Sequence, residues 1–187
     1  MKRIAILGSA GYVVNQHVQS TVANLKIAGA NTGNFIFQYA VRKMIGDSAD
    51  VYHLSYGEDY LWGRPGSLLE EIDLVVLPAA NHLRMDADWT SYNAWLSTID
   101  KPFVVLGLGA QADHSGDPEA TIRKLKANSS VMRLCEILAE KSVYVGVRGE
   151  FSRAVSVGLG IAQAEATGCP SFMISEKADL GHKLQSV

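Results

Sequence analysis

The sequence predicts an α/β fold, a Rossmann-like parallel sheet with helices on both faces. Two observations carry this prediction. Short runs rich in Val, Ile and Leu recur along the chain, and most are continuous rather than alternating, as in strands buried on both faces. Between these runs lie segments with apolar residues at helical spacing. Strand and helix therefore alternate in the order typical of a parallel sheet.

Five apolar runs predict the strands, and each ends at a Gly, a Pro or a polar loop. The predicted strands are residues 4–7, 51–54, 74–77, 103–108 and 143–147. The segment 9–30 fits either a helix or a strand, because its spacing is helical but it is rich in Val and Thr.

Helical spacing predicts a helix beginning after Gly33, one around Trp95, a stretch over 118–141 and a short helix over 151–157. Polar residues at 128–130 are expected to divide the long stretch into two helices. The residues expected along the apolar sides of these helices are Phe35, Tyr39, Met44, Ile45, Trp89, Tyr92, Trp95, Leu96, Ile99, Ile122, Leu125, Leu134, Ile137 and Leu138.

Length and composition narrow the class of protein. A chain of 187 residues with 48% hydrophobic and 19% charged residues fits one globular domain over 1–187. A net charge of −2 without a basic run argues against a nucleic-acid partner. The first apolar run is too short for a signal peptide, and no run could span a membrane. We therefore expect a cytoplasmic protein, or one peripheral at the inner face of the membrane, with Cys135 and Cys169 reduced.

Polar side chains follow three of the predicted strands. Ligands of open parallel sheets bind beyond the carboxyl ends of the strands, where Asn81, His82, Gln111, Arg148 and Glu150 are expected. The guanidinium of Arg148 suits a carboxylate or phosphate, and a histidine such as His82 is a common acid or base at neutral pH. Two other interpretations stay open: Arg148 could instead pair with Glu150, and His82 could point to solvent.

Cofactor and metal motifs are weak or missing. Gly107 and Gly109, with Ala112, match a dinucleotide-binding fingerprint, but the acidic residue that should follow is not clearly placed. Glycines needed for a close backbone approach are the favoured interpretation. Thr32 or Asn34 could cap the helix that begins after Gly33, and the free N–H groups at its start could bind an anion or sugar hydroxyls. Neither a phosphate-binding loop nor a metal-ligand spacing is present.

Taken in order, the segments 29–40, 73–81, 101–111, 147–152 and 168–171 resemble the polysaccharide pyruvyl transferase family over most of the chain. The resemblance implies transfer of the enolpyruvyl group of phosphoenolpyruvate to a sugar hydroxyl of a cell-surface polysaccharide or a lipid-linked precursor, without a metal or other cofactor. It adds motif residues to the site. The predicted substrate-binding residues are Asn31, Gly33, Asn34, Asn81, Gly107, Gly109, Gln111, Glu150 and Ser171, and the predicted catalytic residues are His82 and Arg148.

The family resemblance also implies two Rossmann-like halves in a glycosyltransferase-B-like architecture, of which this chain resembles the amino-terminal half. Residues 168–187 are expected to begin a connection or a second unit, and the isolated chain is expected to bind sugar weakly, to turn over poorly and to self-associate. The turn at 78–81 departs from the Gly-rich turn of many relatives. A nucleotide-sugar glycosyltransferase-like domain and a non-catalytic carbohydrate-binding module stay open as alternatives.

Overall fold

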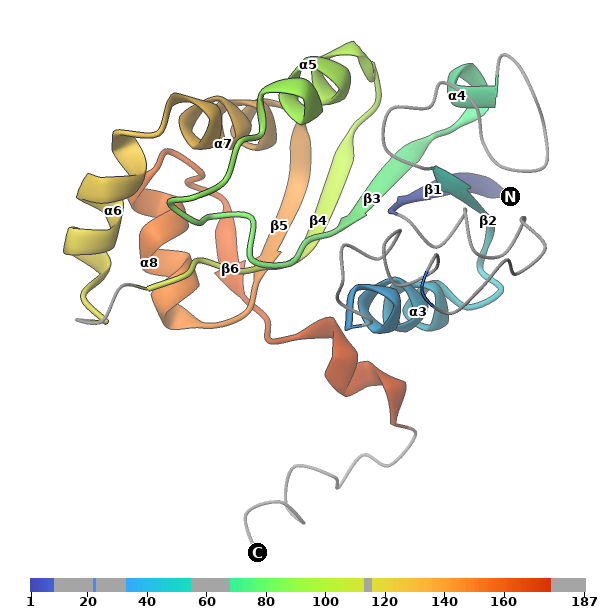
Figure 1. Ribbon diagram of the computed structural model, residues 1–187. Helices are drawn as coiled ribbons and strands as arrows, with labels where there is room; N and C mark the ends of the chain where they lie inside the picture. The colour runs from blue at the N-terminus through green and yellow to red at the C-terminus, as the bar shows by residue number, and fades with distance from the viewer. Residues whose placement is uncertain (9–21, 23–32, 55–67, 113–115, 176–187) are drawn as a thin grey trace, which may run out of the picture.

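The computed structural model describes residues 1–8, 22, 33–54, 68–112 and 116–175. Its strands form one parallel sheet in the order β2-β1-β3-β4-β5-β6 (Figure 1). The strands are β1 (Lys2–Leu7), β2 (Ala49–Leu54), β3 (Leu74–Pro78), β4 (Phe103–Leu108), β5 (Ser142–Val147) and β6 (Ala164–Ala166). All five predicted strands are confirmed. The sequence did not indicate β6, because three residues around the exposed Glu165 make no apolar run.

Helices lie on both faces of this sheet, so the predicted Rossmann-like α/β fold is confirmed. Side chains of β1 show the two faces: Ala5 and Leu7 belong to one buried cluster, whereas Ile4 and Ile6 belong to another. Helices α5 to α8 pack on the first face and α3 on the second (Figure 1). The helices are α3 (Gly33–Ile45), α4 (Leu68–Glu71), α5 (Thr90–Thr98), α6 (Pro118–Lys126), α7 (Ser129–Lys141), α8 (Glu150–Gly158) and the 3-10 helix η1 (Pro170–Ile174).

The apolar sides expected for the helices on the larger face are confirmed. Tyr92, Trp95, Leu96, Ile99 and the expected residues of α6 and α7 are buried, and Trp89 is half-buried against them. Cys135 of α7 is buried as well, and burial raises the pKa of its thiol to about 12. This cluster is the main core of the protein.

The side expected to be buried in α3 is partly wrong. Tyr39 is 59% exposed and Met44 is 49% exposed, whereas Gln38 and Val41 are buried. The face toward the sheet follows the spacing of Gln38, Val41 and Ile45, so one of its members is a polar amide. Because only apolar residues were counted, the predicted buried face of α3 is rotated about the helix axis by about a third of a turn from the observed one.

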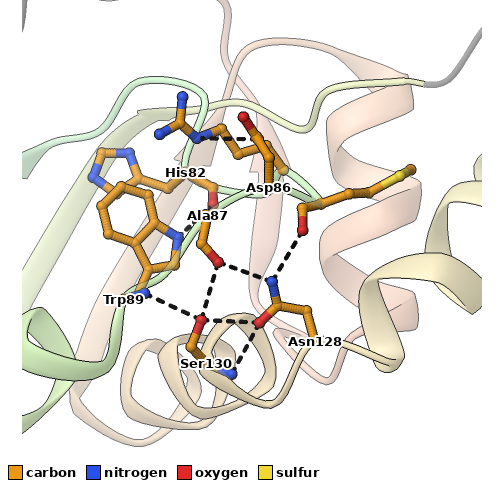
Figure 2. Close-up of polar contacts among 8 residues, drawn as sticks. His82, Asp86, Ala87, Trp89, Asn128 and Ser130 are labelled. Atoms are coloured by element: carbon orange, nitrogen blue, oxygen red, sulfur yellow. Dashed lines mark hydrogen bonds and ion pairs between the residues drawn. The ribbon is translucent and has the colours of Figure 1, made fainter.

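Asn128 both divides the long helical stretch and ties it to the loop that follows β3. Its side-chain oxygen accepts hydrogen bonds from the backbone N–H groups of Ser130 and Val131, which caps α7. Its side-chain amide donates to the backbone carbonyls of Met85 and Ala87 at 3.1 and 2.9 Å (Figure 2). The loop after β3 is therefore anchored at a helix N-terminus.

The order of the strands decides where a ligand is expected to bind. Strand β2 lies on one side of β1, whereas β3 to β6 follow one another on the other side. Open sheets of this kind bind ligands at the carboxyl ends of the strands where that order reverses. Here the reversal lies between β1 and β3, so the residues that follow β1, β3, β4 and β5 share the relevant edge.

Asn128→Ala is expected to destabilise the protein more than Asp117→Ala. Asp117 caps α6 through two backbone N–H groups, as Asn128 caps α7, and losing a cap costs about 1 kcal/mol. Asn128→Ala also removes two hydrogen bonds to the loop after β3, so a further ~1–2 kcal/mol is expected. Urea unfolding of both variants measures the difference. Equal losses would show that the contacts with the loop contribute nothing.

Candidate functional site

Backbone hydrogen bonds join the loops that follow β3 and β4. The Gly109 N–H donates to the Ala80 carbonyl at 2.9 Å, and Leu83 pairs with Ala110 in a parallel bridge. The Gln111 N–H then donates to the Leu83 carbonyl, also at 2.9 Å. Sheet-like pairing thus continues past the ends of the strands. As a result, the residues between these bonds have a fixed backbone.

Arg148 follows β5 and reaches both the end of β4 and the loop after β3. Its Nε donates to the Gly107 carbonyl at 3.0 Å, and its Nη1 donates to the Asn81 side-chain oxygen at 2.9 Å. The guanidinium carbon lies 4.6 Å from the ring centroid of Phe37, which α3 supplies from the other side. The structure therefore places Asn81 and Arg148 together.

The positive charge of Arg148 is not neutralised by a carboxylate in the part of the chain that the structure describes. Both of its hydrogen-bond partners are uncharged. Glu150, the alternative partner, accepts instead from Nε of Arg153 at 2.7 Å. Since the arginine is only half-buried, its remaining N–H groups are available to an anion from solvent.

Gly107 and Gly109 are needed where other groups approach the backbone closely. A Cβ atom at Gly109 would lie 2.6 Å from the side-chain oxygen of Asn81 and 3.3 Å from Cδ of Arg148. Gly107 has a φ of +73°, and a Cβ there would lie 2.6 Å from Cδ of Pro170. The interpretation of these glycines as close-approach positions is confirmed. Pro170 also brings η1, with Ser171, beside β4.

The start of α3 supplies a second part of the edge, next to the end of β1. Gly33 and Asn34 open the helix, and the Asn34 carbonyl accepts from the side-chain amide of Gln38 at 3.2 Å. Gln38 packs against Gly8, where a Cβ would lie 2.6 Å from its Oε1 atom. Asn31, a predicted substrate-binding residue, lies outside the described residues.

His82 follows Asn81, but its ring stacks on Trp89 near the start of α5. The ring centroids are 4.9 Å apart with an angle of 16° between the planes, and Nδ1 accepts from the Ala80 N–H at 3.0 Å. Burial lowers the pKa of His82 to about 4; a hydrogen bond with the Ala80 backbone acts in the opposite direction, whereas the charges of Arg84 and Arg148 lower the pKa further. The imidazole is therefore neutral at pH 7.

The remaining predicted residues, Gln111, Glu150 and Ser171, contact groups other than Arg148. Gln111 is exposed and is held through its backbone, whereas the Glu150 carboxylate pairs with Arg153. Ser171 lies in η1 with its hydroxyl 2.8 Å from Sγ of Cys169. Their predicted roles in substrate binding stay predictions.

Sequence reasoning missed Phe37, Gln38, Trp89 and Pro170 as residues that shape this edge. Phe37 and Gln38 stand three and four residues after Asn34, so helical spacing could have placed all three on one side. Helical spacing placed Trp89 on an apolar side but did not indicate that it stacks on His82, and no local signal indicates that Pro170 lies against Gly107.

The family model for polysaccharide pyruvyl transferase matches residues 22–184. The chain belongs to the polysaccharide pyruvyl transferase family. No curated protein and no solved structure matches it. The described residues of this pyruvyl transferase family member contain no group of His, Cys, Asp and Glu that could hold a metal ion. None of the helices in these residues is long and apolar enough to cross a membrane.

Gly107→Ala is expected to destabilise the protein more than Gly116→Ala. Both glycines have positive φ, which costs an alanine about 1–2 kcal/mol. Nothing lies within 4 Å of a Cβ at Gly116, whereas one at Gly107 would clash with Pro170, which adds ~1–3 kcal/mol. Thermal unfolding of the two variants checks this difference. Equal melting temperatures would mean that η1 moves away without cost.

Proposed function

We propose that this protein transfers the enolpyruvyl group of phosphoenolpyruvate to a sugar hydroxyl of a cell-surface polysaccharide or a lipid-linked precursor, and that Arg148 binds the anionic donor. Membership of the family supports the reaction class. The observation that carries the role of Arg148 is its guanidinium charge, which is held by neutral groups at the carboxyl edge of the sheet without a carboxylate partner in the described part of the chain.

The proposed reaction begins with a proton added to the methylene carbon of phosphoenolpyruvate. A sugar oxygen then bonds to the carbon that carries the phosphate, and a ketal forms when a second hydroxyl replaces the phosphate, which leaves with the electrons of its C–O bond. The hydroxyl protons pass to the enzyme or to solvent. Until the phosphate leaves, the donor carries both a phosphate and a carboxylate, so cationic groups at fixed positions stabilise it most effectively. This scheme requires no metal or redox cofactor.

Arg148 suits this task because its orientation is fixed before a ligand arrives. Two hydrogen bonds hold Nε and Nη1, and the Phe37 ring covers one face of the guanidinium. A side chain held in this way loses little freedom on binding. Phe37 lies in the second turn of α3, so the positive end of that helix faces the same region and also favours an anion.

Arg148→Ala is expected to lower the rate of phosphate release from phosphoenolpyruvate at least tenfold, a change of ~1.4 kcal/mol in the barrier. Arg148→Lys keeps the charge but loses the planar fork, so an intermediate rate is expected. Arg133→Ala is the matched control, because in the part of the chain that the structure describes Arg133 forms an equivalent exposed ion pair with Glu136 on α7, and its removal should leave the rate unchanged. The measurement is phosphate released with a polysaccharide acceptor present.

An unchanged rate in Arg148→Ala would contradict the role given to this arginine. Binding of a nucleotide sugar, without binding of phosphoenolpyruvate, would instead favour a glycosyltransferase-like activity. Binding of sugar with no turnover by the protein would favour a carbohydrate-binding module.

A further inference from the structure

We propose that His82 is a positioning residue, whose neutral imidazole accepts the Ala80 N–H and thereby sets the turn that presents Asn81 to Arg148. This inference rests on the proposed function, since it gives His82 a role in aligning the arginine that binds the donor. It assigns no proton transfer to His82.

The first support is the turn itself. The backbone N–H of His82 donates to the Ala80 carbonyl at 2.9 Å, and the Ala80 N–H donates back to Nδ1 of His82 at 3.0 Å. Asn81 is the residue enclosed by these two bonds. Its side chain then meets Arg148 at 2.9 Å, so its direction depends on the turn around it.

The second support is that Trp89 holds both the ring and the backbone of His82 in place. Trp89 stacks on the ring, and the indole Nε1 donates to the His82 carbonyl at 2.9 Å. The Trp89 N–H in turn donates to the hydroxyl of Ser130, which α7 supplies (Figure 2). Contacts therefore run without a break from the N-terminus of α7 to Arg148.

The third support is the protonation state that this geometry requires. Nδ1 can accept the Ala80 N–H only while it carries no proton, which leaves the proton of the neutral ring on Nε2. In the described part of the chain, the charges that act on the ring are those of Arg84 and Arg148, and Asp86 lies 3.6 Å from Arg84. The other rings packed here, Trp89 and Tyr92, are neutral. Protonating Nδ1 would cost the Ala80 contact and add a third positive charge.

Two substitutions separate positioning from acid–base chemistry. In His82→Asn, the side-chain oxygen stands as many bonds from the backbone as Nδ1 does, so it can accept the Ala80 N–H although it cannot titrate. In His82→Phe, the ring can still stack on Trp89, but no acceptor remains. We expect His82→Asn to keep most of the phosphate release from phosphoenolpyruvate. We expect His82→Phe to lose about tenfold or more, mainly as a higher KM for the donor, because Arg148 is misplaced.

Two further readouts accompany the rates. The pH profile of His82→Asn should match that of the wild type between about pH 5 and 8, because a group that stays neutral contributes no step there. Exchange of the Ala80 amide hydrogen with solvent should be slow in the wild type and in His82→Asn, and fast in His82→Phe. This exchange is measured without substrate on the protein in its native state.

The outcomes distinguish this inference from the proposed function. If the wild type releases no phosphate from phosphoenolpyruvate, the proposed function fails, and the Ala80 exchange still tests the turn. If His82→Asn is as inactive as His82→Phe while Ala80 stays protected, His82 acts as an acid or base and the inference is overturned. Equal Ala80 exchange in all three proteins overturns it as well.

Discussion

The arrangement of this edge depends on one constraint, which is that Arg148 must reach both the end of β4 and the loop after β3. Its Nε donates to the carbonyl of Gly107, a residue of β4 with positive φ, and its Nη1 donates to the side chain of Asn81. Both conditions hold only because β3, β4 and β5 are adjacent and parallel, so that their ends meet at one edge. Gly109 completes the arrangement, since any side chain there would separate Asn81 from Arg148. The order of the strands and these two glycines thus allow the Arg148 guanidinium to make both contacts.

Support for this edge comes from both faces of the sheet. On the larger face, α7 holds the loop after β3 through Asn128 and Ser130, and Trp89 and His82 extend these contacts to Asn81. On the smaller face, α3 brings Phe37 against the guanidinium. Among the described residues the direction of this arginine is set by neutral groups rather than by a carboxylate, and under the proposed function its charge binds the donor.

The sequence predicted most of the fold, because buried parallel strands and amphipathic helices leave regular apolar patterns. It also predicted Asn81 and Arg148, since residues after parallel strands share an edge. The sequence could not reveal the direction of a side chain. The place of His82 after β3 did not indicate that its ring stacks on Trp89 and accepts a backbone N–H, and its predicted catalytic role stays a prediction. Gln38 was missed because a buried amide breaks the apolar pattern of α3, and β6 was too short to leave one.

The most direct test of this account is a double-mutant cycle for phosphoenolpyruvate binding, measured by calorimetry on Asn81→Ala, Arg148→Ala and the double variant. If Asn81 acts by aligning Arg148, its removal should weaken binding in the wild type and have little further effect once Arg148 is gone. The account therefore predicts a coupling energy of about 1 kcal/mol between the two residues. Strictly additive losses would show that Asn81 and Arg148 contribute separately, and would contradict the claim that this hydrogen bond organises the site.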